Sequence, residues 1–315
     1  MGNKKNIKLL LVLAGLSVLT AFIYLYDGSS NNANFNPSKF MIADTAAVNK
    51  VVLKKGGVTN TLTEKSGQWV VNEKYPADPN LGKLVKAVLK LAVVKRKAPK
   101  SSMKKISAQL KRDDVLVEVY SGDAIITSFY AGGNDNKTTS YFMEAGEEQP
   151  YIMAIPGYSS YISGIFAFDE SGWRDKTIFS TFWQVVLSLK VDFPNNAQNS
   201  FEMKRENKFL TVGGIKNMDT AKVVNYVRMY EHFTAARFVK PGTSSVYDSL
   251  LNGAPIATIT LKDIDLSKSR TLDIFPFVEA DNNVLGLIKE DNQLVLIQKN
   301  KIFGLLQKKE FFEKD

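Results

Sequence analysis

The residues that most often carry catalysis or bind metals are scarce in this sequence. It contains no cysteine and a single histidine, His232. Zinc and iron–sulfur sites need thiolates or several imidazoles, so the composition excludes both, together with thiol nucleophiles and disulfide frameworks. His232 follows Glu231 on a predicted helix and shares a face with Asn225 and Arg228, which predicts a solvent-facing side chain rather than a catalytic base.

Two short acidic clusters offer oxygen ligands, but their spacing is that of turns. Residues 134–136 read Asn-Asp-Asn and residues 263–265 read Asp-Ile-Asp, and neither has the spaced acidic series and terminal glutamate of a calcium loop. The sequence also lacks a Gly-x-Ser-x-Gly elbow, a glycine-rich phosphate loop and a paired-histidine motif. We therefore expect no catalytic, cofactor-binding or metal-binding residues and a protein that is not an enzyme. A hydrolase with a carboxylate pair stays open as the least favoured alternative.

Positive charge is concentrated in one stretch of the chain. The sequence has 41 Lys and Arg against 32 Asp and Glu, a net charge of +9, and residues 83–112 contain eleven basic residues and no acidic one. Helical spacing along and just beyond a predicted helix over residues 79–93 places four of the lysines on one face, opposite an apolar stripe of Leu84, Val88 and Leu91. This basic ridge is the predicted binding site, and it consists of Lys83, Lys86, Lys90 and Lys97.

The basic ridge has two interpretations. A row of cations suits anionic lipid headgroups, envelope polysaccharide or an acidic partner protein. The same pattern is equally typical of a solvated helix face with lysines for solubility. Nucleic acid is disfavoured, because the ridge has no interleaved aromatic residues on which bases would stack.

The elements that would position this ridge begin with a membrane segment. Residues 9–26 form an uncharged run of 18 residues, preceded by Lys4, Lys5 and Lys8, which predicts an uncleaved transmembrane anchor with its N-terminus in the cytoplasm. A cleaved signal peptide stays open, with Gly28 and Ser30 as the small residues at its cleavage site. Residues 27–38 are predicted to be a flexible linker. The expected location is the bacterial inner membrane, single-pass, with the C-terminal part in the periplasm.

The remaining chain is predicted to be α+β and to consist of two tandem repeats, residues 39–178 and 179–315, each an antiparallel sheet with packed helices. Each repeat would contribute a hairpin, a third strand, a helix, a short second helix and a four-strand meander. The predicted long helices, 79–93 and 218–236, align at an offset of 139, and Trp69 and Phe209 are expected in equivalent core positions. The predicted meanders, listed by strand, cover residues 115–120, 124–131, 138–144 and 151–155, then 256–261, 271–277, 284–288 and 294–297.

Three segments resemble a known bacterial family. They are residues 68–71 (Gln-Trp-Val-Val), 75–78 (Tyr-Pro-Ala-Asp) and 173–179 (Trp-Arg-Asp-Lys-Thr-Ile-Phe), and they look like the family catalogued as domain of unknown function 4340. The resemblance spans roughly residues 40–300 and implies an association with ABC transporters of the gliding-motility type and their auxiliary exterior subunits. The family supplies no catalytic residue to carry over to this chain.

Two smaller features have structural and functional interpretations. Arg174 and Asp175 are expected to form an ion pair over a buried Trp173. Residues 44–46, 219–221 and 248–250 match the pattern of a bacterial O-glycosylation acceptor, and 219–221 equally matches a helix N-cap.

Two classes of function follow from these observations. The first is a membrane-anchored extracytoplasmic scaffold or auxiliary subunit that binds another envelope protein, with the gliding-type ABC transporter suggested by the resemblance. The alternative is a binder of anionic lipid or envelope polysaccharide through the basic helix. The first predicts a stable co-purifying complex, and the second predicts salt-sensitive binding without one.

Overall fold

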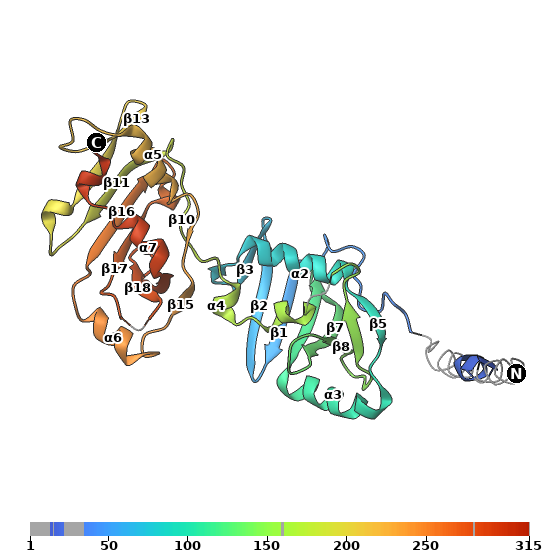
Figure 1. Cartoon of the computed structure of the whole chain (residues 1–315). Helices are drawn as coiled ribbons and strands as arrows, with labels where there is room; N and C mark the ends of the chain where they lie inside the picture. The colour runs from blue at the N-terminus through green and yellow to red at the C-terminus, as the bar shows by residue number, and fades with distance from the viewer. Residues whose placement is uncertain (1–12, 15, 22–34, 159–160, 280, 315) are drawn as a thin grey trace, which may run out of the picture. The chain divides into compact units, whose positions relative to one another are not determined.

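The computed structural model describes most of the folded chain, in two compact units. The described residues are 13–14, 16–21, 35–158, 161–279 and 281–314. One unit comprises Met1–Glu64 with Gly82–Ala167, and the other comprises Lys65–Leu81 with Phe168–Asp315 (Figure 1). The predicted repeats, which meet between residues 178 and 179, stay a prediction. The two units are defined by their internal contacts, which do not show whether one arose by duplication of the other.

The first sheet has nine strands in the order β4-β3-β2-β1-β6-β7-β8-β9-β5. Neighbours such as β1 and β2, β1 and β6, and β5 and β9 pair antiparallel. The bounds are β1 (Lys50–Lys55), β2 (Val58–Lys65), β3 (Gln68–Val71), β4 (Tyr75–Pro76), β5 (Val93–Lys97), β6 (Val115–Ser121), β7 (Ala124–Gly133), β8 (Ser140–Glu144) and β9 (Tyr151–Ala154).

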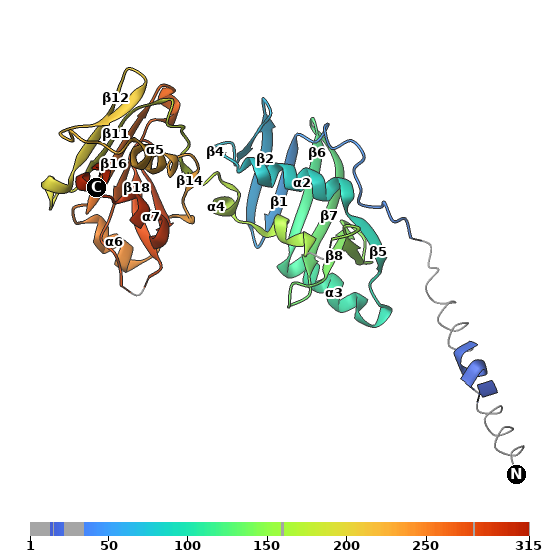
Figure 2. The ribbon, with the colours of Figure 1, turned by 45° about the horizontal axis from the view of Figure 1, so that its top comes forward.

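Helix α2 (Pro79–Leu91) lies across one face of this sheet in both views (Figures 1 and 2). It begins at a proline, which suits a first helical position, directly after Asp78, whose Oδ1 accepts a hydrogen bond from the backbone N of Asn80 at 2.8 Å. Helix α3 (Lys100–Asp113) and the 3-10 helix η1 (Ile162–Ala167) complete this part of the chain. Five aromatic side chains pack together in its core: Phe40, Phe129, Phe142, Tyr151 and Phe166.

The second sheet has eight strands in the order β13-β12-β11-β16-β17-β18-β19-β15. Its bounds are β11 (Val186–Asp192), β12 (Phe201–Glu206), β13 (Phe209–Val212), β15 (Arg237–Val239), β16 (Ala257–Asp263), β17 (Arg270–Ile274), β18 (Asn283–Ile288) and β19 (Gln293–Gln298). A separate pair joins β10 (Thr177–Phe179) to β14 (Phe233–Thr234). The helices are α4 (Glu170–Trp173), α5 (Thr220–Arg228), α6 (Ser245–Leu251) and α7 (Lys299–Leu305), with 3-10 turns η2 (Ala197–Asn199), η3 (Leu266–Lys268) and η4 (Lys309–Phe312).

The predicted α+β class with antiparallel sheets is confirmed, and the meander strands fall where the sequence placed them, within a few residues. The two sheets also share a strand order. If β4 is set aside, the first reads β3-β2-β1-β6-β7-β8-β9-β5, and the second has β13-β12-β11-β16-β17-β18-β19-β15 in the same places. The tandem repeat itself stays a prediction.

The predicted buried face of the first long helix is correct at Val88 and wrong at Leu84 and Leu91. Helix α2 buries Val85, Val88 and Leu89, whereas Leu84 and Leu91 are 47% and 48% exposed. Both sets of residues are apolar at helical spacing, so only the position of the sheet decides which set it covers. The buried Val223, Tyr226 and Val227 of α5 match the buried set of α2 at an offset of 138, not 139.

The expected equivalence of Trp69 and Phe209 is also wrong. Strands β3 and β13 share the burial pattern exposed, buried, intermediate, buried. Phe209 is the exposed first residue of β13, and Leu210 takes the place of Trp69. The two strands align with Trp69 opposite Leu210, one residue away from the expected pairing. A shift of one residue moves every side chain of a strand to the other face of the sheet.

Among the described residues, no helix is both long enough and apolar enough to cross a membrane. The predicted anchor over residues 9–26 and the predicted linker over residues 27–38 fall largely outside the described residues.

The buried face of α2 can be tested with two identical substitutions. Leu89 is 1% exposed, so Leu89→Ala should lower the free energy of unfolding by about 2–5 kcal/mol. Leu91→Ala removes the same atoms from a half-exposed position and should lower it by less than about 1 kcal/mol. Urea unfolding followed by circular dichroism measures both. Equal losses of stability in the two variants would mean that α2 also buries the face that contains Leu91, as the sequence predicts.

Candidate functional site

The four lysines of the basic ridge do not share one helix face. Lys83, Lys86 and Lys90 lie on α2, but this helix ends at Leu91, and Lys97 is the last residue of strand β5. The predicted position of Lys97 on the helix face is wrong, because residues 93–97 form a strand that pairs with β9, whereas its assignment to the binding site stays a prediction.

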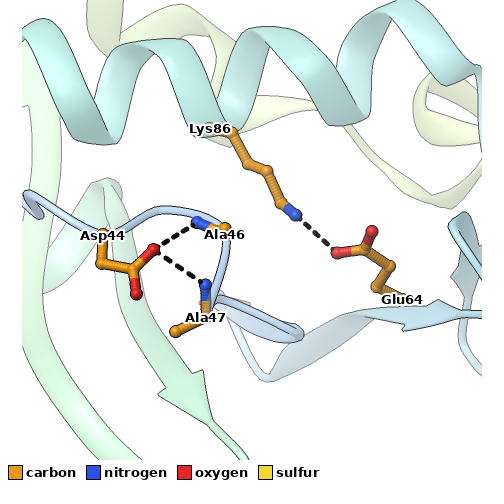
Figure 3. Close-up of polar contacts among 5 residues, drawn as sticks. All are labelled: Asp44, Ala46, Ala47, Glu64 and Lys86. Atoms are coloured by element: carbon orange, nitrogen blue, oxygen red, sulfur yellow. Dashed lines mark hydrogen bonds and ion pairs between the residues drawn. The ribbon is translucent and has the colours of Figure 1, made fainter.

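Lys86 forms an ion pair within the fold. Its Nζ lies 2.6 Å from Oε2 of Glu64, and both side chains are about three-quarters buried. Figure 3 shows the Lys86 side chain reaching from the helix to the strand that carries Glu64. An ion pair of this kind holds α2 on the sheet, so Lys86 does not belong to a surface that is free to bind a ligand.

The turn beside this ion pair explains one of the glycosylation-like motifs. Asp44 accepts hydrogen bonds from the backbone N of Ala46 at 3.0 Å and of Ala47 at 3.3 Å (Figure 3). This geometry is an Asx turn, for which Asp is a favoured residue. At 219–221, Asp219 caps α5 by accepting from the backbone N of Ala221 and Lys222. Both aspartates therefore have a structural role.

Most of the remaining cations in this stretch have no acidic partner. Lys111 pairs with Glu148, and Arg112 lies 2.8 Å from Asp113. Within the part of the chain that the structure describes, no carboxylate lies within ion-pair distance of the other basic residues between 83 and 105, apart from Lys86. We call these eight residues the cation segment: Lys83, Lys90, Lys95, Arg96, Lys97, Lys100, Lys104 and Lys105.

The fold fixes the direction of these side chains through their apolar neighbours. In β5, Val94 is buried, and the register with β9 is interrupted between Val94 and Arg96. In α3, Ile106 and Leu110 pack with Ala98 and Met143 in a small core. Lys100, Lys104 and Lys105 are left on the exposed face of α3.

The charge at the start of α3 is unfavourable for the stability of this helix. The N-terminus of a helix carries a partial positive charge, which favours acidic residues there. Lys100 is the first residue of α3, and the first turn contains no acidic residue. At the other end, Lys111 and Ser107 both bind Glu148, and these hydrogen bonds lower the pKa of that carboxyl group. The charge arrangement at the start of α3 is therefore not explained by helix stability.

The sequence reasoning missed five residues of the cation segment. Lys95, Arg96, Lys100, Lys104 and Lys105 were counted as part of a basic stretch but were not assigned to the site. The ridge is selected by helical spacing, and this spacing does not apply to Lys95 and Arg96, which lie in strand β5. Local charge density, without any assumed secondary structure, is the signal that could have found them.

The acidic clusters and the histidine form no catalytic arrangement. Asn134 Oδ1 accepts from the backbone N of Thr138 and Thr139, which makes residues 134–136 a turn. Asp263 is buried and bonded to Thr181, and Asp265 caps η3. His232 is exposed. Among the described residues, no group of three or more His, Cys, Asp or Glu could hold a metal ion.

The expected ion pair between Arg174 and Asp175 is wrong, although Trp173 is fully buried as predicted. The Arg174 guanidinium lies between the rings of Tyr75 and Phe238, 3.6 Å from each centroid. Its Nη2 donates to Oε1 of Gln293 at 2.8 Å, and burial lowers the pKa of Arg174. A guanidinium stacks on aromatic faces, so two rings and an amide here replace the carboxylate.

Comparison with known proteins gives one match. The family model described as "Domain of unknown function (DUF4340)" matches residues 69–249, which is more than half of the chain. None of the curated proteins and none of the solved structures matches the chain significantly.

The charge at the start of α3 predicts that reversing one surface charge stabilises the protein. Lys100→Glu should raise the free energy of unfolding by about 0.3–1 kcal/mol, because it places an anion at the helix N-terminus. The matched control Lys111→Glu lies in the last turn of the same helix and loses its pair with Glu148, so it should lower stability. Urea unfolding of both variants measures the difference. A loss of stability in Lys100→Glu would mean that this lysine has a structural role.

Proposed function

The chain belongs to the family described as Domain of unknown function (DUF4340), and we propose that it is a membrane-anchored extracytoplasmic scaffold or auxiliary subunit that binds another envelope component. The family description names no activity, so the proposal rests on the surface chemistry of this chain. The binding surface in this proposal is the cation segment.

One observation carries the proposal: eight cations within 23 residues have no acidic partner among the described residues, and one of them opens a helix against its dipole. A surface shaped only for solubility mixes charges of both signs. Elsewhere in the described chain some lysines are paired, as with Lys54 and Glu118 at 2.7 Å, and others such as Lys176 and Lys240 are not, so the distinguishing feature is the run of basic residues from 83 to 112 without an acidic one. Charge that is left uncompensated in one place supports the use of that place for attracting an anionic partner.

The anchor and the linker belong to the same proposal. Residues 9–26 act as a single membrane span of the bacterial inner membrane, and the rest of the chain lies in the periplasm. A linker over residues 27–38, whose Pro37 is already bonded to Val94 of the first sheet, reaches at most about 40 Å, which keeps the cation segment close to membrane components. Because of the resemblance to the family, an ABC transporter of the gliding-motility type is the partner to test first.

The two sheets suggest how the surface arose. Their shared strand order supports a duplication, with repeats over residues 39–178 and 179–315. The charge was not duplicated, because α6, at the position of α3, reads Ser-Val-Tyr-Asp-Ser-Leu-Leu and contains no basic residue. A function of one copy explains this asymmetry better than a need of the fold, which both copies share.

Anionic lipid or envelope polysaccharide is the second candidate ligand. It is favoured by the short linker, since a polycationic surface held close to the membrane suits a polyanion. Such binding weakens steeply with salt and leaves no stable protein complex.

The cation segment can be tested in the full-length protein in native membranes. The variant combines Lys95→Glu, Lys97→Glu, Lys100→Glu and Lys104→Glu. Since each cation near an anionic surface contributes about 1 kcal/mol, the variant should lose binding by several orders of magnitude. The measurement is quantitative mass spectrometry of proteins that co-purify in gentle detergent, together with sedimentation on vesicles that contain anionic lipid.

The control variant has the same net charge and changes four exposed lysines of the second unit: Lys208, Lys216, Lys262 and Lys308. The scaffold proposal expects a specific protein to be lost from the cation-segment variant and retained by the control. Loss of vesicle binding alone would favour the lipid ligand. Identical profiles for wild type and both variants would reject the cation segment as a binding surface.

A further inference from the structure

The second unit contains an open cavity of about 860 Å³, within the usual size range of ligand sites. Its walls come from α4, from strand β15 with its flanks, and from α6 with the loop before it. Five consecutive residues, 236–240, line it, so the whole of β15 runs along the cavity. Figure 1 shows β15 and α6 at the same end of the second sheet.

Strand β15 is the last strand of its sheet, and its outer edge is open. It pairs with β19 on one side. On the other side, no residue that the structure describes forms a hydrogen bond with the backbone of Arg237, Phe238 or Val239. Unpaired backbone groups along an edge strand are a template for an added strand.

The first sheet shows what this position can accept. Strand β5 occupies the same end of the first sheet, and its outer side is not open, because the backbone N of Val94 donates to the carbonyl of Pro37 at 2.8 Å. A segment from outside the sheet thus supplies a backbone partner to β5. The corresponding strand of the second sheet has no such segment among the described residues.

The charges along the cavity favour an acidic ligand. Lys176, Arg237 and Lys240 line it, and the latter two are exposed. Within the described chain, none of the three has a carboxylate at ion-pair distance. The acidic residues of the lining are Asp169 and Asp281, and both are already engaged by the fold.

The two carboxylates bind groups of the protein itself. Asp169 caps α4 by accepting from the backbone N of Gly172 at 2.7 Å. Asp281 accepts from the hydroxyl of Tyr247 and from the backbone N of Asn283 at 2.9 Å, and these hydrogen bonds lower its pKa. They therefore fix the walls of the cavity and do not pair with its cations.

Three valines from different segments give the cavity an apolar part near α6. Val246 is 49% exposed and lines the cavity together with Val239 and Val278. Tyr247 is held by Asp281, and the loop before α6 is held by Asp248, which accepts from the backbone N of Gly242 at 3.0 Å. A ligand would meet an apolar wall whose shape is set before it binds.

We propose that this groove binds an extended, acidic segment of a partner protein, which adds to the second sheet alongside β15. Backbone hydrogen bonds to β15 would supply the pairing, Arg237 and Lys240 would bind acidic side chains, and Val239 and Val246 would take the apolar side chains between them. This site is separate from the cation segment and does not rest on it.

The test uses the full-length protein in detergent and short fluorescent peptides that combine glutamate with valine, leucine or phenylalanine in several spacings, including Glu-x-Val, because Arg237 and Val239 lie on the same face of β15. At least one of these peptides should bind, and the amide hydrogens of residues 237–239 should exchange more slowly in its presence. The same peptide with alternate backbone nitrogens methylated keeps its charge but cannot form a strand ladder, so it should not bind. Equal binding of the methylated peptide, or no binding by the whole set, would overturn the proposal.

Two variants locate the binding in the groove. Arg237→Glu with Lys240→Glu should weaken the peptide by about tenfold or more, because charge-assisted contacts become repulsive. Val246→Trp fills the groove and should do the same without a change of charge. The matched control, Lys262→Glu with Lys308→Glu, should bind as wild type does, and so should the cation-segment variant. Wild-type affinity in both groove variants, with unchanged circular dichroism spectra, would overturn the proposal.

Discussion

The architecture depends on one long-range strand pairing in each sheet. The first strand, β1 or β11, pairs with the strand that follows the two helices, β6 or β16. In the first sheet Val51 lies opposite Val119 and Leu53 opposite Val117, and in the second Leu189 lies opposite Leu261 and Val191 opposite Ile259. All eight side chains are buried. These cross-strand pairs join the N-terminal hairpin to the meander, so each sheet becomes continuous only when this contact forms.

The pairing leaves the intervening chain free to carry other features. We call the chain between the paired strands and outside the hairpin the excursion. In the first sheet it includes α2, β5 and α3, and in the second it includes α5, β15 and α6. Each excursion returns a short strand to the far edge of its sheet, where β5 pairs with β9 and β15 pairs with β19. The cation segment and most of the groove lie on these excursions. The exposed positions of the excursions can change with little effect on the sheet, because the central pairs do not involve them.

The sequence predicted those parts of the fold that depend on local periodicity. The alternation of Val115, Val117 and Val119 predicted both the strand and its buried face, and the three residues are buried. The face of α2 could not be predicted in the same way, because Leu84 and Leu91 are as apolar as Val85 and Leu89. Strand β5 reads as a charged link, Val-Val-Lys-Arg-Lys, and becomes a strand only by pairing with residues more than 50 positions away.

The candidate site shows the same limit. A count of charge located the basic stretch, but the ion pair of Lys86 with Glu64 and the strand position of Lys97 depend on tertiary contacts. The groove along β15 had no signal in the sequence at all. Its lining comes from four separate segments, and the hydrogen bond between Tyr247 and Asp281 joins residues 34 positions apart.

The edge strands β5 and β15 are protected from unwanted strand pairing in two different ways. An open edge strand invites indiscriminate pairing, and proteins limit this with short strands, charged side chains or a covering segment. Strand β5 is covered at Val94 by the carbonyl of Pro37 and carries three basic residues. Strand β15 has only three residues, Arg237–Val239, and it is flanked by Lys240 and walled by α6. Positive charge at both ends of so short an edge repels a second copy of the same strand, yet it attracts an acidic one. The feature that protects the edge from aggregation is therefore the feature that would make it selective.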